Sequence, residues 1–265
     1  MLEKMIFGRY IPGDSIVHRI DARAKLIFVF LFIAIVFLAN SWITYGLLIL
    51  FTFLIVKLSG IRFYFIVMGL KPILFLLIFT FLLHTFFTKE GTVLLDLGFT
   101  EIYTGGVIQG VFIAIRFFVL VVMTTILTLS TTPISITDAL ELLLNPFKKI
   151  KLPVHELALM MSISLRFIPT LMDETDKIMK AQMARGSDMT TGPFKERLKA
   201  VVPLLIPLFV SAFKRAEDLA TAMEVRGYRG GEGRTRYRQL DWRFRDTGAI
   251  LLLIVLAVVL LLLRN

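Results

Sequence analysis

Two arginines, each followed by glycine, end two long helical segments of this 265-residue chain, in Ala184-Arg185-Gly186 and Val225-Arg226-Gly227. Glycine tolerates the left-handed backbone that commonly ends a helix, so each arginine is expected at an exposed helix tip. A guanidinium group carries a fork of N–H donors that suits carboxylates and backbone carbonyls. The helix dipole alone explains one such arginine. Two in matched contexts, 41 residues apart, favour two similar docking contacts with partners.

Methionines gather around these tips. Six of the 11 lie between residues 160 and 189, namely Met160, Met161, Met172, Met179, Met183 and Met189, and Met223 precedes the second arginine by three positions. A single methionine usually fills a gap in a core, but a group of them suits a surface that repacks against a changing partner. We therefore expect part of this region to be a contact surface.

A third candidate is Arg116, in the middle of the apolar run 107–128. Ionisable residues inside a membrane segment are rare and mark functional positions. The apolar runs contain no Asp or Glu, so the sequence supplies no partner carboxylate there. Backbone carbonyls, Gln109, a second membrane protein or a water-filled crevice remain open as its surroundings.

Several kinds of chemistry are not expected of this chain. It has no glycine-rich phosphate loop with a following Lys-Ser or Lys-Thr, so ATP hydrolysis is not expected. Its three histidines, His18, His84 and His155, do not have the spacing of metal ligands, and there is no cysteine. The acidic stretch 173–176 lacks the second carboxylate cluster of a metal–diphosphate site, and instead suits the start of a helix segment. We expect no catalytic residue, no metal and no cofactor in this chain.

The composition indicates a membrane protein, with 57% hydrophobic residues and a mean hydropathy of +0.79. Residues 65–87, 107–128 and 250–263 form apolar runs that can each cross a hydrocarbon core of ~30 Å. The run 26–56 has 31 residues and would make a helix of roughly 46 Å, which is too long. We expect two short spans there, joined by a turn at Asn40-Ser41, with Trp42 and Tyr45 as interface anchors.

These runs predict an all-α polytopic membrane protein with about five transmembrane helices and a cytoplasmic domain of long helices. Its parts are an N-terminal arm (1–25), a four-span block (26–130), a cytoplasmic domain (131–246) and a last span (247–265). The cytoplasmic domain carries 19 of the 30 Lys and Arg residues, which places it and the N-terminus inside the cell. The same bias accounts for much of the net charge of +10, so no nucleic-acid partner is expected.

Three helical segments are expected in the cytoplasmic domain. The first runs from Pro133 to about residue 144, the second from about residue 154 to Arg185, and the third from Pro193 to Arg226. The third includes the apolar run 200–213, interrupted by Pro203 and Pro207. This run is too short and too interrupted to be assigned as a span, and either dips into the membrane or packs under the bundle.

Four motifs, in order along nearly the whole chain, resemble a known family: Asp21-Ala22-Arg23-Ala24-Lys25, Arg166-Phe167-Ile168-Pro169, Ala184-Arg185-Gly186 and Val225-Arg226-Gly227-Tyr228. The family is the transmembrane T component of energy-coupling factor (ECF) transporters, of the type with a shared module. It often has proline at position 22 and alanine at position 225, and neither difference removes an arginine. The paired Arg-Gly motifs are the most specific part of the resemblance.

The resemblance implies a non-catalytic scaffold in the bacterial cell membrane. Such a scaffold joins two cytoplasmic ABC-type ATPases, which bind the ATP, to membrane S components that bind vitamins. It implies that two long coupling helices dock on the ATPases through Ala184, Arg185, Gly186, Val225, Arg226 and Gly227. We expect the S component to contact Met172, Met179, Met183, Pro203, Pro207 and Met223. The lipid bilayer is the remaining partner.

Other interpretations remain open on the sequence alone. Within the family, the chain could be a T component dedicated to cobalt or nickel uptake. Outside it, a membrane enzyme acting on a prenyl or lipid substrate would need the acidic stretch 173–176 as its site. A stand-alone secondary transporter would require inverted repeats and polar residues at midplane, of which only Arg116 is available.

Overall fold

The computed structural model describes residues 10–96, 101–151, 153–186, 194–230 and 240–264. The chain divides into two compact units, which are described separately. The bundle unit comprises Gly8–Ala139 and Leu240–Asn265, and the helix-pair unit comprises Met1–Phe7 and Leu140–Gln239.

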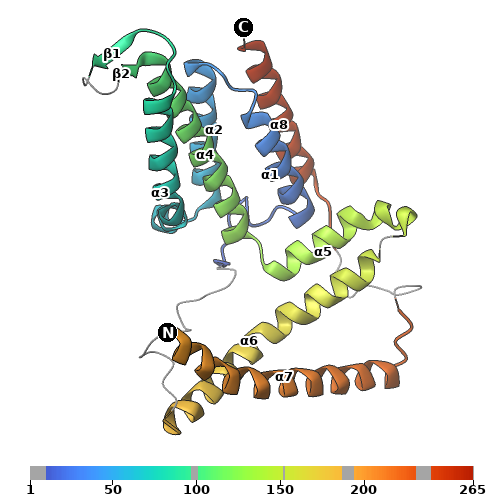
Figure 1. The fold of residues 1–265 in the computed structure, drawn as a ribbon. Coiled ribbons are helices and arrows are strands. Elements are labelled where there is room, and N and C mark those ends of the chain that lie inside the picture. The colour runs from blue at the N-terminus through green and yellow to red at the C-terminus, as the bar shows by residue number, and fades with distance from the viewer. Residues whose placement is uncertain (1–9, 97–100, 152, 187–193, 231–239, 265) are drawn as a thin grey trace. The chain divides into compact units, whose positions relative to one another are not determined.

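Five long helices and a small hairpin build the bundle unit (Figure 1). The helices are α1 (Ala22–Val36), α2 (Trp42–Ser59), α3 (Phe63–Phe87), α4 (Thr104–Ser130) and α8 (Phe244–Leu262). The hairpin, which the sequence did not predict, pairs β1 (Val93–Asp96) antiparallel with β2 (Glu101–Tyr103) in the connection between α3 and α4. α5 (Pro133–Leu144) begins in this unit, as expected from Pro133.

The expected turn between two short helices in the run 26–56 is confirmed. α1 ends at Val36, and Ser41 starts α2 by accepting a hydrogen bond from the Thr44 backbone N–H in a reciprocal capping box. Trp42 is exposed, as an interface anchor would be. Tyr45 is not, because its ring is 1% exposed inside the bundle and stacks on Phe112 with ring centroids 4.5 Å apart.

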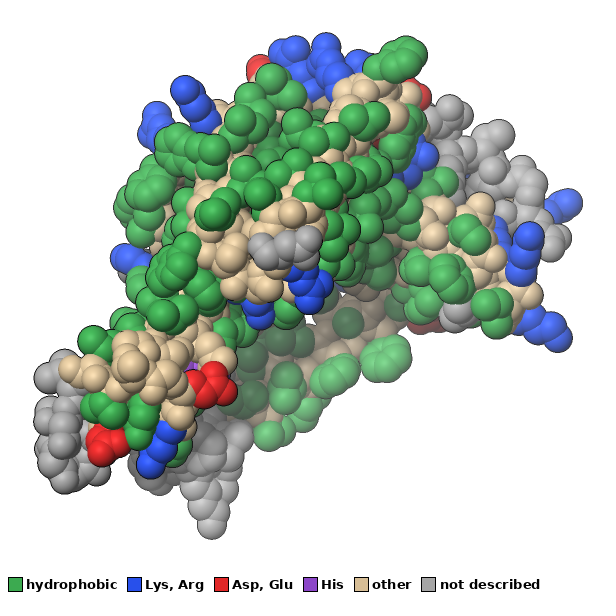
Figure 2. Space-filling model, turned by 90° about the horizontal axis from the view of Figure 1, so that it is seen from above, with side chains coloured by type: hydrophobic (Ala, Val, Ile, Leu, Met, Phe, Trp, Pro, Cys, Tyr) green, Lys and Arg blue, Asp and Glu red, His purple; other side chains and the backbone are tan. Residues whose placement is uncertain are grey.

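The core of the bundle unit is a single apolar cluster to which α1, α2, α3, α4 and α8 all contribute. Its fully buried members include Phe32, Leu48, Val119, Leu253 and Leu260. Many outward-facing side chains are also large and apolar, and Figure 2 shows hydrophobic side chains gathered on the visible face, with Lys and Arg in small groups around them. Helices that are apolar on every side are typical of a membrane domain.

Small residues bring α3 and α4 close together. A Cβ atom added to Gly106 would lie 2.7 Å from the His84 carbonyl oxygen, and one added to Gly110 would lie 3.1 Å from that of Phe81. The two backbones can approach this closely only because these positions have no side chain. Gly106 and Gly110 therefore permit the close packing of α3 against α4.

A polar cluster joins three distant parts of the bundle unit at the N-terminal end of α1. We define it by Asp21, Arg23, Lys25, Thr131 and Asp246. The Asp21 carboxylate caps α1 through the Arg23 backbone N–H (2.8 Å) and pairs with the Arg23 guanidinium (2.9 Å). Asp246 is 1% exposed, and its carboxylate accepts the backbone N–H groups of Asp21 (2.8 Å) and Arg243 (2.6 Å). The starts of α1 and α8 are thereby held together.

The remaining bonds of the polar cluster reach the end of α4 and the segment before α8. The Lys25 ammonium donates to the Ser130 carbonyl (2.9 Å) and to the Thr131 hydroxyl (3.2 Å). The Arg23 guanidinium donates to the Leu240 carbonyl (2.7 Å) and lies over the ring of Trp242. These contacts explain why α1 and α8 begin at Ala22 and Phe244, four and three residues before the expected spans.

The helix-pair unit contains the end of α5, the 3₁₀ helix η2 (Asn145–Ile150), α6 (Val154–Ala184) and α7 (Phe194–Val225). A contact of 3.1 Å between His155 Nδ1 and the Glu141 carboxylate ties the start of α6 to α5. Pro169 lies inside α6, and Pro203 and Pro207 lie inside α7, so the prolines interrupt neither helix. Met189 and Pro193 lie outside the described residues.

By length and composition, five helices of the described chain could cross a membrane: α2, α3, α4, α6 and α8. This set differs from the expected one by a single exchange. α1 has 15 residues and a length of ~22 Å, short of a ~30 Å hydrocarbon core. α6 has the lowest mean hydropathy of the five, 1.2 against 1.9 to 2.5 for the others. The chain is a multi-pass membrane protein of all-α architecture.

The polar cluster yields a stability prediction. We expect Asp246→Ala to lower the stability of the bundle unit by roughly 2–4 kcal/mol, because two backbone N–H groups lose their acceptor in a buried site. Thermal unfolding of the purified protein in detergent should show a reduced transition temperature. The matched control is Asp14→Ala, which removes an exposed carboxylate. Equal unfolding temperatures for the two variants would contradict the assigned role.

Candidate functional site

The first predicted tip closes α6. Arg185 is the C-cap residue directly after α6, and its backbone N–H still donates to the carbonyls of Ala181 (3.2 Å) and Gln182 (3.1 Å). Gly186 follows with φ of +87° and donates to the Met183 carbonyl (3.0 Å). This left-handed glycine is the helix end that the Arg-Gly pair predicts.

The second tip has the same construction at the end of α7. Gly227 has φ of +74° and donates to the Glu224 carbonyl (2.9 Å), while the Tyr228 backbone N–H donates to the Met223 carbonyl (3.0 Å). These two bonds form a complete Schellman motif around Arg226. Both tips therefore share a left-handed glycine whose N–H donates to the carbonyl three residues earlier.

Both arginine side chains are exposed. Val225, beside the second arginine, is 83% exposed, and a Cβ atom added to Gly186 or Gly227 would meet nothing within 4 Å. Within the described ranges, neither the Arg185 nor the Arg226 guanidinium makes an ion pair or a side-chain hydrogen bond. The donors of both forks are thus available to a partner.

A polar contact fixes the crossing of α6 and α7. The Glu174 carboxylate of α6 accepts from the Ser211 hydroxyl (2.9 Å) and pairs with the Arg215 guanidinium, both on α7. Glu174 belongs to the acidic stretch 173–176, so one of its carboxylates is engaged in helix pairing. Among the described residues no group of His, Asp and Glu could hold a metal ion.

The two helices run in opposite directions across this contact. A groove of about 320 Å³ lies between them, lined on α6 by Ile163, Phe167 and Leu171 and on α7 by residues from Ala212 to Met223. The start of α6 therefore faces the end of α7, and Figure 1 shows the two helices crossing. At ~1.5 Å per residue, Arg185 and Arg226 lie on the order of 35 Å apart, at opposite ends of the pair.

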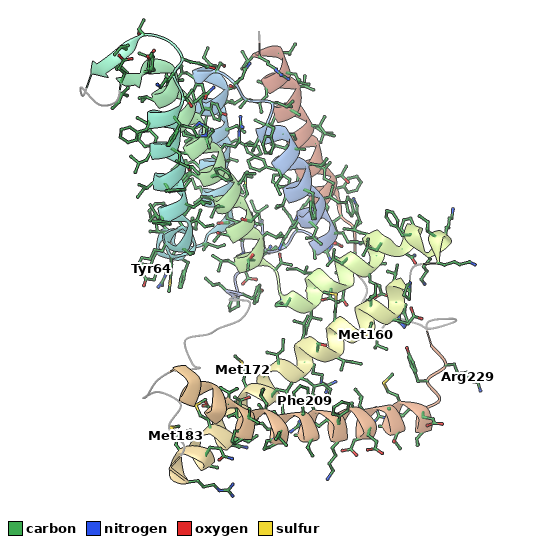
Figure 3. The ribbon with its side chains drawn as sticks, in the orientation of Figure 1. Tyr64, Met160, Met172, Met183, Phe209 and Arg229 are labelled. Carbon is green, nitrogen blue, oxygen red and sulfur yellow. The ribbon has the colours of Figure 1, made fainter. Side chains whose placement is uncertain are left out.

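The methionines expected at a contact surface divide between the crossing and the tips. Met172 is half-buried near the crossing and Met183 is exposed near the end of α6 (Figure 3). Met179 is half-buried, and Met223 lines the groove. Pro203 and Pro207 are exposed on α7.

An apolar face of α7 is uncovered within the run 200–213. For this run the sequence left two placements open, in the membrane or packed under the bundle. Val202, Ile206, Phe209 and Phe213 follow one another at spacings of three and four residues, so they share one side of the helix. All four are exposed, with Phe213 at 72%. Phe209 points away from the α7 backbone near the crossing (Figure 3). Such a patch marks a surface for a protein or a membrane.

Arg116 lies in the bundle unit and has partners within the chain. Its guanidinium donates to the Tyr45 hydroxyl (2.7 Å) and to the Ala39 carbonyl (3.4 Å), and it lies over the ring of Phe37 at 5.0 Å. A backbone carbonyl was one of the partners that the sequence left open, and the Tyr45 hydroxyl was not foreseen. Arg116 therefore ties α4 to the turn between α1 and α2.

Sequence reasoning missed the polar cluster. The motif from Asp21 to Lys25 entered only as a family landmark, and Asp246 was not singled out. The sequence does contain one indication of this cluster, the charged residues Asp21, Arg23, Lys25 and Asp246 directly before or at the start of apolar runs. Charged groups at the start of a helix that enters a membrane need polar partners there.

The helix ends yield a second prediction. We expect Gly227→Ala to loosen the end of α7, because a residue with a side chain pays roughly 1–2 kcal/mol to occupy the left-handed region. Hydrogen exchange of the Gly227 position and Tyr228 amides should be faster than in the parent chain. Gly227→Asn should lose less protection, since asparagine tolerates this conformation. Equal exchange in the Ala variant and the parent chain would refute the assignment.

Comparison with known proteins agrees with this architecture. The sequence model of the CbiQ family, described as "Cobalt transport protein", matches residues 13–237. The energy-coupling factor transporter transmembrane protein EcfT of Bacillus subtilis (strain 168) is 64% identical over 264 residues, with 100% of both chains covered. The EcfT proteins of Macrococcus caseolyticus and Listeria innocua are 61% and 59% identical over 265 residues, again over the full length of both chains. The chain therefore belongs to the EcfT proteins of the CbiQ family, the non-catalytic transmembrane components of energy-coupling factor transporters.

Proposed function

We propose that the chain is the scaffold and coupling subunit of an ATP-driven uptake transporter, joining two ABC-type ATPases to membrane S components that bind vitamins. The observation that carries this proposal is the pair of exposed arginine tips, each followed by a left-handed glycine, at opposite ends of α6 and α7. Arg185 and Arg226 lie on the order of 35 Å apart, which is too far for both tips to enter one binding site. Two similar binding sites, one on each of two similar subunits, fit this arrangement.

Each tip is suited to a docking contact on an ATPase. Arg185 and Arg226 present unpaired guanidinium forks, and the small neighbours Ala184 and Gly186 leave the first fork unobstructed. Val225 replaces a smaller alanine beside the second, and it is itself exposed enough to join the contact. The ATP then belongs to the partners, and this chain needs no cofactor.

The uncovered face of α7 is the proposed contact for the S component. Val202, Ile206, Phe209 and Phe213 supply the apolar area. Met172, Met179 and Met183 on α6 and Met223 on α7 are the adaptable side chains proposed to extend the contact. Pro203 and Pro207 lie within the same stretch of α7. A surface of this composition suits several different vitamin-binding partners in turn.

Coupling follows from the crossing geometry. ATP binding closes the ATPase dimer and moves the two docked tips relative to each other. Because the tips are the far ends of two helices held at one crossing by Glu174, Ser211 and Arg215, this movement changes the angle between α6 and α7. The angle in turn reshapes the α7 face that holds the S component. Such an element, biased from both ends, is what energetic coupling requires.

The proposed membrane placement puts the polar-cluster end of the bundle unit in the cytoplasm of a bacterial cell. Arg19, Arg23, Lys57, Arg62 and Arg245 are at or near this end, whereas Lys89 at the hairpin end stands beside Glu90. The bias of basic residues towards the cytoplasmic side supports an internal N-terminus. α1 is then a short span in a locally thinned bilayer. The five charged residues between 173 and 180 keep the second half of α6 outside the hydrocarbon.

The docking role gives a third prediction. Arg185→Ala and Arg226→Ala should each weaken ATPase binding by roughly 30-fold or more, which corresponds to ~2 kcal/mol for a lost charge-assisted contact. Affinity is measured with purified ATPases, and vitamin uptake is measured in cells. The double variant should abolish uptake.

Two kinds of control separate the docking contact from the general effect of positive charge near the tips. Lys180→Ala and Arg229→Ala remove exposed cations near the two tips and should leave binding unchanged. Arg185→Lys and Arg226→Lys keep the charge but not the fork, and should restore only part of the affinity. Full uptake by the double Ala variant would reject the docking role.

The orientation gives a fourth prediction. The chain has no cysteine, so a single introduced cysteine is its only site for a thiol reagent. In intact cells, a membrane-impermeant thiol reagent should label Glu90→Cys and fail to label Arg62→Cys, which should react after the membrane is permeabilised. Labelling of the Arg62→Cys variant from outside would contradict the proposed orientation and, with it, docking of the tips on cytoplasmic ATPases.

A further inference from the structure

An apolar pocket of about 240 Å³ lies within the bundle unit, beside the polar cluster. Helices α1, α2, α4 and α8 and the segment before α1 line it, and one side is open. Its wall is formed mainly by aliphatic and aromatic side chains, among them Ile20, Phe28, Ile55, Met123, Ile126 and Leu252. Because helices line the pocket on several sides and its volume is small, it has room for a slender apolar chain and not for a partner helix.

Two cations lie at this otherwise apolar pocket. Lys25 is 7% exposed, and its ammonium is held by the Ser130 carbonyl, the Thr131 hydroxyl and, at 3.4 Å, the His18 carbonyl. No carboxylate of the described chain lies within ion-pair distance of it. Arg245, from the first turn of α8, is exposed and also lines the pocket.

The carboxylates near these cations are already engaged. Asp21 is paired with Arg23, and Asp246 accepts two backbone N–H groups. Arg19, next to the pocket-lining Ile20, and Lys57, next to Leu58, are exposed and add positive charge near this end. Cations therefore outnumber carboxylates around the pocket, and the net charge there is positive.

A buried hydroxyl supports the same interpretation. Ser130 lines the pocket and is 2% exposed, and its Oγ has no hydrogen-bond partner among the residues that the structure describes. A buried polar group without a partner is costly and calls for an explanation. A bound molecule with a polar group near Lys25 would supply one.

We propose that this pocket holds one acyl chain of an anionic phospholipid, with the phosphate bound by the exposed Arg245 and attracted by the nearby charge of the buried Lys25 ammonium. The apolar wall takes the chain, and the two cations take the charge, which is the division of chemistry in such a lipid. A neutral apolar molecule would leave the cations unused, and a small polar metabolite would find almost no partner along the wall. The residues of this site all belong to the bundle unit, whereas the proposed ATPase and S-component contacts are residues of the helix-pair unit.

Filling the pocket is the first arm of the test. Gly248 lines the pocket on α8, and a Cβ atom added there would meet nothing within 4 Å. Gly248→Leu therefore puts a side chain into the space of the acyl chain without a backbone clash. Gly46→Leu is the matched control, since Gly46 is also a helical glycine with nothing within 4 Å and does not line the pocket.

Removing a cation is the second arm. Arg245→Gln should weaken binding of an anionic lipid by about fivefold, the effect of one cation beside an anionic membrane surface, and should leave a zwitterionic lipid unaffected. Arg264→Gln, at the other end of α8, is its control and should change neither.

The measurement uses the full-length protein in vesicles of equimolar phosphatidylcholine and phosphatidylglycerol. A trace of either lipid carries a photoreactive group on one acyl chain, and the labelled peptides are identified by mass spectrometry. We expect the phosphatidylglycerol probe to mark α1, α4 and α8 at the pocket, to lose this labelling in Gly248→Leu and to keep it in Gly46→Leu. Equal thermal unfolding temperatures exclude misfolding as the cause, and a destabilised Gly248→Leu is replaced by Ala249→Leu at the next pocket position.

Three results would overturn the proposal. Labelling spread evenly over lipid-facing residues would mean that only the surrounding bilayer is detected. Equal pocket labelling by the phosphatidylcholine and phosphatidylglycerol probes would remove the role of the cations. Unchanged pocket labelling in both pocket-filling variants would show that the acyl chain lies elsewhere.

Discussion

The buried carboxylate of Asp246 is the contact on which the bundle unit depends. A helix that enters a membrane brings its first backbone N–H groups to a place where water is scarce, and each needs an acceptor. Asp246 provides one for its own helix, at Arg243, and one for α1, at Asp21. A residue near the end of the chain thereby fixes the first helix. Arg23 and Lys25 extend the same network to Leu240 and to the end of α4, so the polar cluster sets where the helices of the bundle start and stop.

The helix-pair unit follows a different rule. Its helices are amphipathic and long, and only a short polar contact around Glu174 together with an apolar groove joins them. This leaves the α7 face at Phe209 and both arginine tips without partners in the described chain. A pair of helices that buries so little of its own apolar surface is incomplete by itself. Its exposed groups are those that a complex with other subunits would cover.

The sequence predicted the parts of this structure that local rules control. The apolar runs, the break at Asn40-Ser41 and the glycine after each arginine depend on hydrophobicity, capping and backbone freedom, which act over a few residues. Pro133 likewise began α5 as expected. The docking residues were therefore found from their local pattern, although their roles stay predictions.

What the sequence could not predict depends on contacts between distant residues. Asp21 and Asp246 are 225 positions apart, and nothing local to either indicates the other. The burial of Tyr45 is a similar case, because its hydroxyl is engaged by Arg116 on a helix 71 positions away. The length and composition of α1 and α6 are likewise ambiguous, since 15 apolar residues and 31 mixed ones both lie near the limit for a span.

The chain connections explain why the polar cluster matters for more than stability. Within the described residues the chain leaves the bundle unit through α5, two residues after Thr131, and returns through the segment that begins at Leu240. Lys25 holds the first of these places and Arg23 the second. A force applied to α6 and α7 therefore reaches the bundle along the described chain through these two anchored points. Because Lys25 and Arg23 stand one turn of helix or less apart on α1, both paths converge on the start of a single helix.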